Sequence, residues 1–180
     1  LAWEEPPRED DRYPYTESVA WGDWDGDGDL DLALGNWGNP SQVYANDGGT
    51  LYLAWEEPLD DNSPNAYTRS VAWGDWDGDG DLDLALGDGG YDPRSPSRVY
   101  ANESGILTLA WEEPPGVYAS GSYGMTQSVA WGDWDGDGDL DLALGNAWGA
   151  PSQVYSNDTG TLTRVWEEPL DDNDWYGDTS

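Results

Sequence analysis

The stretch SVAWGDWDGDGDLDLALG occupies residues 18–35 and returns without a change at residues 70–87 and 128–145. Its centre, DWDGDGDLD, carries aspartate at relative positions 1, 3, 5, 7 and 9 and glycine at position 6. A calcium ion takes about six to eight oxygen ligands, and short carboxylates on alternate residues of a tight turn can point inward together. Glycine at position 6 permits the sharp backbone bend that such a loop needs. The spacing therefore predicts three calcium sites, one in each copy of the stretch.

The predicted ligands are the aspartates of the three loops, with the position-7 residue of each loop offering its backbone carbonyl oxygen. They are Asp23, Asp25, Asp27, Asp29, Asp31, Asp75, Asp77, Asp79, Asp81, Asp83, Asp133, Asp135, Asp137, Asp139 and Asp141. Plain solvated turns would leave these carboxylates to repel one another without a counter-ion. An EF-hand or dockerin loop would require an acidic ligand at position 12 and flanking helices. Position 12 is leucine in every copy and the flanks are short and alternating, so we expect the turn of a β-hairpin.

The stretch AWGDWDGDGDLDLALG resembles the FG-GAP/VCBS repeat, the blade unit of integrin-α-like β-propellers. The resemblance extends over all three copies and so over most of the chain. The phenylalanine or valine that commonly follows the first aspartate is replaced by Trp24, Trp76 and Trp134, which are also large and apolar and can pack between blades. The resemblance implies a calcium-binding propeller protein, secreted or on the cell surface, with a structural or adhesive role.

Two further motifs recur alongside the acidic stretch. The first is WEEP, whose tryptophans are spaced by 52, 56 and 55 residues, and the second is PSQVYAND with its variants. Their first residues are Trp3, Trp55, Trp111 and Trp166 for WEEP, and Pro40, Pro96 and Pro151 for PSQVYAND. A repeat of this length indicates one supersecondary unit per period, as in propellers.

Each repeat is expected to form four short antiparallel strands. In the first repeat these are residues 18–24, 30–34, 42–45 and 50–56, with a hairpin turn rich in Asn, Asp and Gly at residues 46–49. No segment has helical periodicity, and four antiparallel strands make one propeller blade. The predicted fold is therefore all-β, with propeller-type blades.

The predicted division of the chain follows from this count of strands. Residues 1–6 are the orphan fourth strand of a preceding blade, 18–58, 70–114 and 128–169 are the three blades, and 170–180 are a linker toward a next repeat. Propellers usually close with about four to eight blades, so we expect a window cut from a longer array. Copies of the chain are expected to join as a ring or as a head-to-tail filament, because unpaired strand edges invite strand addition. The apolar faces built from Val19, Trp21, Leu32 and their equivalents are expected to be exposed at both ends.

Composition restricts the partners. Among 180 residues there are 38 acidic residues and six arginines, with no lysine, histidine or cysteine, and the formal charge is −32. Such a charge argues against nucleic acid and against anionic membrane surfaces, and no apolar run is long enough for membrane insertion. Thirteen tryptophans and 11 tyrosines are too many for a disordered acidic chain. Without cysteine the chain has no disulfide framework, so calcium is the cross-link available to stabilise the fold. The absence of cysteine also argues against thrombospondin-type calcium repeats, which carry disulfides.

Other signals leave alternatives open. The tryptophans that recur in every blade are expected in the core between blades, whereas Trp37 and Trp148 lie in variable loops. These two are candidates for a lectin-like carbohydrate-binding site, with packing of the loop as the equal alternative, and glycans or cell-surface proteins are the corresponding partners. Asn102 and Asn157 begin N-x-[ST] sequons in a turn where a glycan would be exposed. Without histidine, cysteine or lysine we do not expect an enzyme; a glycosidase built from carboxylates is the third alternative.

Overall fold

The computed structural model describes residues 15–59, 66–90, 96–114, 125–147 and 150–169. The predicted orphan strand at residues 1–6 and the predicted linker at 170–180 lie outside this part. Twelve β-strands form three antiparallel sheets of four strands, each in the order in which its strands follow along the chain. The described residues contain no helix, and thus none that could span a membrane. The prediction of an all-β fold built from four-stranded propeller-type blades is confirmed.

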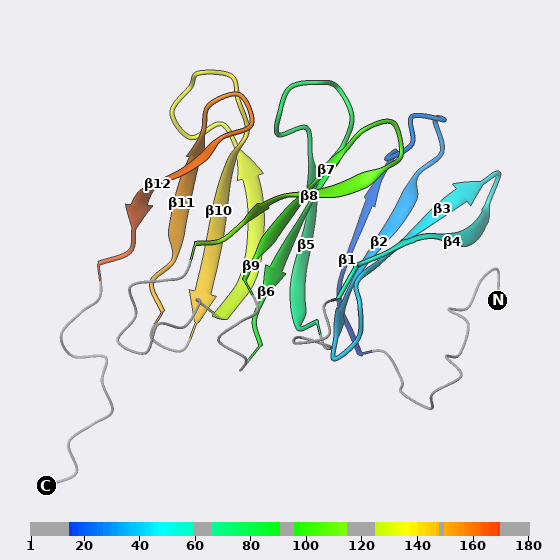
Figure 1. Cartoon of the computed structure of the whole chain (residues 1–180), viewed down its shortest axis with the longest axis horizontal. Helices are drawn as coiled ribbons and strands as arrows, with labels where there is room; N and C mark the ends of the chain where they lie inside the picture. Colours follow the sequence, from blue (N-terminus) through cyan, green and yellow to red (C-terminus); the bar gives the residue numbers. More distant parts are fainter. Residues whose placement is uncertain (1–14, 60–65, 91–95, 115–124, 148–149, 170–180) are drawn as a thin grey trace, which may run out of the picture.

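We call the three sheets blades 1, 2 and 3. Blade 1 consists of β1 (Tyr15–Gly22), β2 (Asp31–Trp37), β3 (Gln42–Asp47) and β4 (Thr50–Glu56). Blade 2 consists of β5 (Thr68–Gly74), β6 (Asp83–Asp88), β7 (Arg98–Asn102) and β8 (Leu107–Glu112). Blade 3 consists of β9 (Met125–Gly132), β10 (Asp141–Ala147), β11 (Gln153–Asn157) and β12 (Leu162–Glu167). Figure 1 shows them side by side along the long axis, without closure into a ring.

Strand boundaries differ from the prediction by a few residues, for local reasons. The first strand ends at Gly22 because Asp23 already belongs to the acidic loop, and it begins earlier, with a bulge between Thr16 and Ser18. The third strand continues to Asp47, so the hairpin turn contains only Gly48 and Gly49, whose φ angles are 57° and 94°. Positive φ at both positions is the conformation of a type I′ two-residue hairpin turn.

The core lies between the blades. Alternation along the strands directs one face of each sheet toward the preceding blade and the other toward the following blade. The first cluster combines Trp24, Ala33 and Val43 of blade 1 with Val71, Leu84, Leu86, Tyr100 and Leu107 of blade 2. The second cluster repeats this arrangement between blades 2 and 3, and each is closed by an edge-to-face tryptophan–tyrosine pair, Trp55–Tyr100 and Trp111–Tyr155, with 5.0 Å between ring centroids.

The faces at the two ends correct one expectation. Val19 and Trp21 of blade 1 are exposed, as expected, but Leu32 is buried, because it packs with Leu34, Tyr44 and Leu51. In blade 3 the equivalents of Val19 and Leu32 face blade 2 and are buried. The large apolar residues exposed in blade 3 include Trp134, on the opposite face of the sheet, and Val165 and Trp166 of β12. The two ends therefore present different surfaces.

Candidate metal centres

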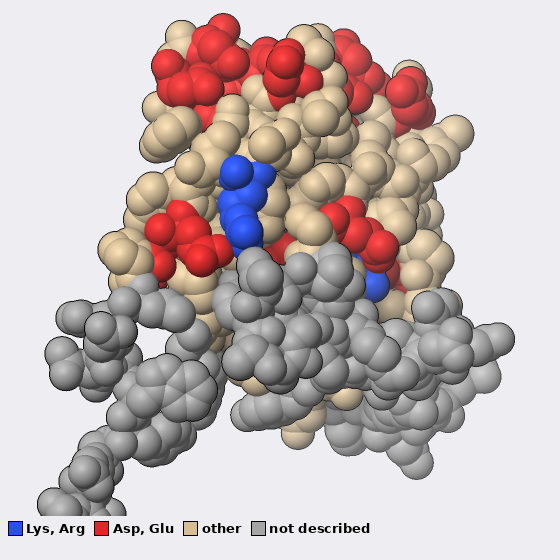
Figure 2. Space-filling view, turned by 60° about the vertical axis from the view of Figure 1, so that its left-hand side comes forward, with Lys and Arg blue, Asp and Glu red and all other residues tan. Residues whose placement is uncertain are grey.

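The three acidic loops join the first and second strand of each blade and lie at the same end of the molecule. In the first loop, Gly26 and Gly28 have φ angles of 75° and 96°, a left-handed conformation that side chains disfavour. The backbone N–H groups of Asp27 and Gly28 donate to carboxylate oxygens of Asp25 and Asp23, both at 3.1 Å. These bonds curl the loop around its own carboxylates. Figure 2 shows acidic side chains gathered along the edge where Figure 1 places the loops.

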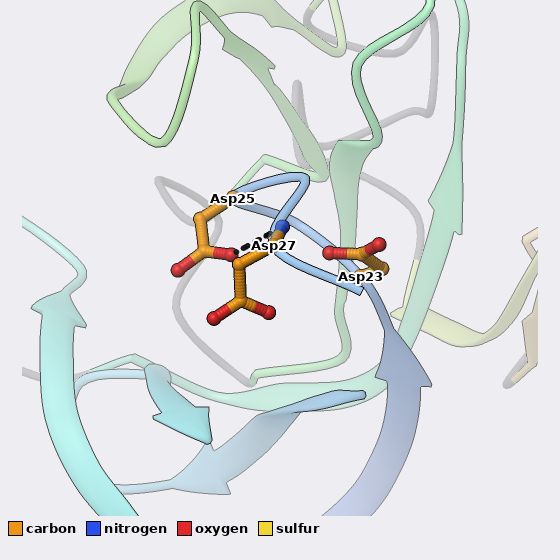
Figure 3. A group of neighbouring side chains, drawn as sticks. All are labelled: Asp23, Asp25 and Asp27. Carbon is orange, nitrogen blue, oxygen red and sulfur yellow. Dashed lines mark hydrogen bonds between the residues drawn. The ribbon is translucent and has the colours of Figure 1, made fainter. Parts of the chain in front are cut away.

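Each loop brings three carboxylates together, with one oxygen from each residue all within 4.8 Å of one another. The groups are Asp23, Asp25 and Asp27; Asp75, Asp77 and Asp83; and Asp133, Asp135 and Asp141. Figure 3 shows the first group, with the hydrogen bond from Asp27 to Asp25. Among the described residues, Oδ1 of Asp23 is buried without a hydrogen-bond partner. A hard cation would supply that partner, and an all-oxygen donor set of this kind fits calcium.

The aspartates at position 9 hold the base of each loop. Asp31 is fully buried and accepts hydrogen bonds from the backbone N–H groups of Trp24 at 2.9 Å and Asn46 at 2.8 Å. Asp83 and Asp141 make the same two bonds in the other blades. Burial raises the pKa of Asp83 to about 6, although its two backbone hydrogen bonds lower it. Position 9 therefore links the loop to the third strand of its blade.

The aspartates at position 7 have a second task that the sequence pattern did not reveal. The Asp29 carboxylate accepts the backbone N–H of Gly48 at 2.9 Å, in the turn between β3 and β4. Asp81 accepts Ser104 at 2.7 Å, and Asp139 accepts Thr159 at 2.9 Å. Each carboxylate thus fixes a neighbouring hairpin turn through one of its oxygens, while the backbone carbonyl of the same residue is the group predicted to face the ion. Besides the position-7 aspartate, one further predicted ligand in each loop lies outside the groups of three carboxylates. These residues are Asp31 in the first loop, Asp79 in the second and Asp137 in the third.

Asn102 and Asn157 correct the prediction of exposed glycan acceptors. Both side chains are completely buried. The Asn102 amide donates to the carbonyl of Trp24 in the preceding blade at 2.6 Å and to that of Leu82 at 3.1 Å. Asn157 donates likewise to Trp76 and to Leu140. The amide nitrogen that would carry a sugar donates hydrogen bonds between blades instead, so the expectation of a projecting glycan is wrong.

Trp37 lies at the end of β2 and contacts the next blade. Its ring centroid is 4.8 Å from that of Tyr67 in an edge-to-face arrangement, and the Arg69 guanidinium lies 4.3 Å above the ring. A backbone bridge also joins Trp37 to Tyr67. These contacts favour the loop-packing alternative over a carbohydrate platform. Trp148 lies outside the described residues.

Comparison with known proteins shows what these repeats resemble. A model of the FG-GAP-like repeat matches residues 23–86. Cartilage acidic protein 1 of Homo sapiens is 27% identical over an alignment of 159 residues that covers 84% of this chain and 23% of that protein. Its counterparts in Mus musculus and Xenopus tropicalis are 28% and 29% identical over 157 and 163 residues, covering 84% and 87% of this chain and 24% and 25% of the relatives. The chain thus spans about a quarter of the length of these relatives. The resemblance predicted from the acidic stretch is confirmed: the chain carries FG-GAP-like repeat sequence over residues 23–86.

Proposed function

We propose that this chain is a calcium-stabilised repeat unit of an extracellular propeller-type protein with a structural or adhesive role. The observation that carries the proposal is the set of three loops, each of which gathers carboxylate oxygens within 4.8 Å around a turn. The buried and unpaired Oδ1 of Asp23, among the described residues, adds a position where a cation is needed. When bound, calcium would neutralise part of the carboxylate charge and hold the loop closed.

The chain's own residues determine how such a site would work. Glycines with positive φ allow the turn, and N–H groups of the loop orient the carboxylates before an ion arrives. The position-7 and position-9 aspartates tie the loop to the rest of the blade. A loop stabilised in this way also stabilises the hairpin between the third and fourth strands. We expect affinities on the order of 10⁻⁴ to 10⁻³ M, the range of extracellular calcium modules.

The extracellular and structural assignment is supported by the relatives and by the distribution of charge. The relatives' name, cartilage acidic protein 1, refers to cartilage and to acidity, and this chain has 38 acidic residues among 180. The partners we propose are further blades of the same kind, glycans or cell-surface proteins, and not nucleic acid. We propose no enzymatic role, because the clustered carboxylates are used in the loops and their adjoining turns.

Removal of calcium tests this function. We expect EDTA to lower the melting temperature of the chain, because the aspartates then repel one another without compensation. Calorimetric titration should give three calcium ions for the natural chain and one fewer for Asp77→Asn. Glu103→Gln removes the same charge from an exposed position in the same blade, outside the loop, and should leave three. An unchanged melting temperature in EDTA would disprove the calcium assignment.

A further inference from the structure

The contact between neighbouring blades has a ridge on one side and a groove on the other. The Trp73 indole of blade 2 lies against Gly22 of blade 1, where an added Cβ would be 2.8 Å from the ring. Its Nε1–H group donates to the Ala20 carbonyl at 3.3 Å. Val71 lies in the same way against Gly35, at 2.8 Å from an added Cβ. Tryptophan and valine thus form the ridge, and two glycines form the groove.

The same contact occurs a second time, between blades 2 and 3. Trp131 lies against Gly74, at 2.6 Å from an added Cβ, and donates to the Ala72 carbonyl at 3.3 Å. Val129 lies against Gly87, at 2.7 Å from an added Cβ. Because the acidic stretch is identical in all three repeats, every blade carries both the ridge and the groove.

The described residues of blade 1 leave its ridge uncovered, and those of blade 3 leave its groove unfilled. The ridge of blade 1 is formed by Val19 and Trp21, which are 57% and 56% exposed. The groove of blade 3 is formed by Gly132 and Gly145: among the described residues, an added Cβ would meet nothing within 4 Å at Gly132, and at Gly145 only Ser128 of the same blade. Beside Gly132 lies an open pocket of about 210 Å³, lined among others by Ala130, Trp134 and Val154.

A third pair of groups matches across the two ends. Inside the chain, Asn102 donates to the Trp24 carbonyl of the preceding blade as well as to Leu82 of its own blade. Asn46, its equivalent in blade 1, makes the bond within its own blade, to Leu30 at 3.0 Å. Trp134, the equivalent of Trp24, is 58% exposed at the other end of the array. A second copy would bring Asn46 to the Trp134 carbonyl.

We propose that the β1 face of one copy docks on the β9 face of a second copy, with Trp21 over Gly132, Val19 over Gly145 and Asn46 at the Trp134 carbonyl. This contact deepens the structural role proposed above and continues the interface that the chain forms twice internally. It is centred on β1, because Leu32, Leu34 and Tyr44 on the same face are already buried. The contact is heterologous, so each added copy offers a new free face. The copies therefore form a ring if the rotation between them closes, and a filament if it does not.

Sedimentation velocity over a range of concentrations, with calcium in excess, tests the contact. We expect the natural chain to associate, and Trp21→Ser to weaken association by about thirtyfold or more, as for a tryptophan at the centre of an interface. The matched control is Tyr52→Thr, which removes an exposed aromatic ring from β4 and introduces the residue found at the equivalent positions 108 and 163. It should associate like the natural chain.

Mixing two defective copies makes the test specific. Gly132→Val fills the groove, so Gly132→Val and Trp21→Ser should each be monomeric at protein concentrations at which the natural chain is just associated. Their mixture retains one intact ridge and one intact groove and should form a dimer that does not grow further. Monomeric natural chain, or no dimer in the mixture, would overturn the proposal. Both variants should still bind three calcium ions, so a failure of docking is distinguished from a failure of the calcium assignment.

Discussion

The asparagine near the end of the third strand, just before the turn to the fourth strand, connects one acidic loop to the next. Asn102 donates to the Trp24 carbonyl at the start of the first loop, and its own Oδ1 accepts the Gly105 N–H at 2.8 Å. The same turn is held by Asp81 of the second loop, through the N–H of Ser104. A cation that orders the second loop therefore also orders the turn that holds the first loop. Asn157 repeats this connection between the second and third loops.

Replacement of Asn102 should show how much this connection contributes to the free energy of unfolding. Asn102→Ala is compared with Asn46→Ala in a Trp21→Ser background, where no second copy is bound. Among the described residues, the side-chain hydrogen bonds of Asn46 stay within its own blade, whereas Asn102 also reaches the preceding blade. We expect Asn102→Ala to lower the free energy of unfolding by about 1–3 kcal/mol more, because it leaves a buried carbonyl unpaired. Urea unfolding in calcium measures this, and calcium titration should show weaker coupling between sites. Equal losses in the two variants would contradict the connection.

Sequence spacing predicted the loop residues because they contact one another within nine residues of sequence. Asn102, by contrast, contacts Trp24, which is 78 positions away. Its sequon indicated a glycan, but the structure places the amide between blades. One signal was present in the sequence: asparagine also occupies this position in the first repeat, at Asn46, where no sequon follows. A residue retained at this position in all three repeats, with or without a sequon, indicates a structural role.

At the scale of strands, the second glutamate of the WEEP motif meets different partners in different blades. Glu57 and Glu113 follow β4 and β8 and are both buried. Glu57 accepts a hydrogen bond from Arg98 of the next blade at 3.1 Å. The position of Arg98 is occupied in blade 3 by Gln153, and Oε1 of Glu113 has no hydrogen-bond partner among the described residues. Burial raises the pKa of Glu113 from 4.5 to about 7, although the Ser97 N–H lowers it.

This difference predicts a dependence of stability on pH. The folded state binds the Glu113 proton more tightly than the unfolded state, so its stabilising contribution is complete below about pH 4.5 and is lost as pH rises through about 7. The loss amounts to about 3 kcal/mol. In excess calcium, Glu113→Gln should therefore gain stability relative to the natural chain by about this amount between pH 4.5 and pH 8. Denaturant unfolding at both pH values measures it, and a constant difference would contradict the raised pKa. Gln153→Arg places a counterpart of Arg98 beside Glu113 and should therefore also reduce the pH dependence of the free energy of unfolding.

The order of the strands could be predicted because alternation and turn residues are local signals. The fourth strand of blade 1 was predicted at residues 50–56 and is found at Thr50–Glu56. The first strand was predicted three residues too late, because the bulge near Ser18 interrupts the alternation that marks its beginning. The ion pair between Glu57 and Arg98 joins residues 41 positions apart and could not be predicted from spacing.

At the scale of the whole molecule, exposure is decided by the neighbouring blade. Trp24 and Trp76 are buried, but Trp134 is 58% exposed, although the three stand in identical stretches of sequence. The prediction of a core position between blades is correct for Trp24 and Trp76 and wrong for Trp134, because no described residue packs as a fourth blade against blade 3. A sequence pattern gives the face on which a side chain lies; the neighbouring sheet determines whether that face is buried.

The total charge leads to a last prediction about salt. The chain carries a formal charge of −32, and much of its acidity lies along the edge that holds the three loops (Figure 2). Raising the ionic strength from about 0.01 M to about 1 M shortens the Debye length from about 30 Å to about 3 Å and so screens repulsion between loops. In EDTA, added sodium chloride should therefore raise the melting temperature.

The same salt should have a smaller effect in excess calcium, because bound ions already compensate the carboxylates at short range, where screening is weak. Calorimetric melting at several sodium chloride concentrations, with EDTA or with calcium, measures both dependences on one chain. Salt and calcium act on different distances: salt relieves repulsion between loops, while calcium also fixes the carboxylates within each loop. High salt should therefore restore only part of the stability that EDTA removes. Full restoration by salt would mean that the loops need only charge screening and not a coordinated ion.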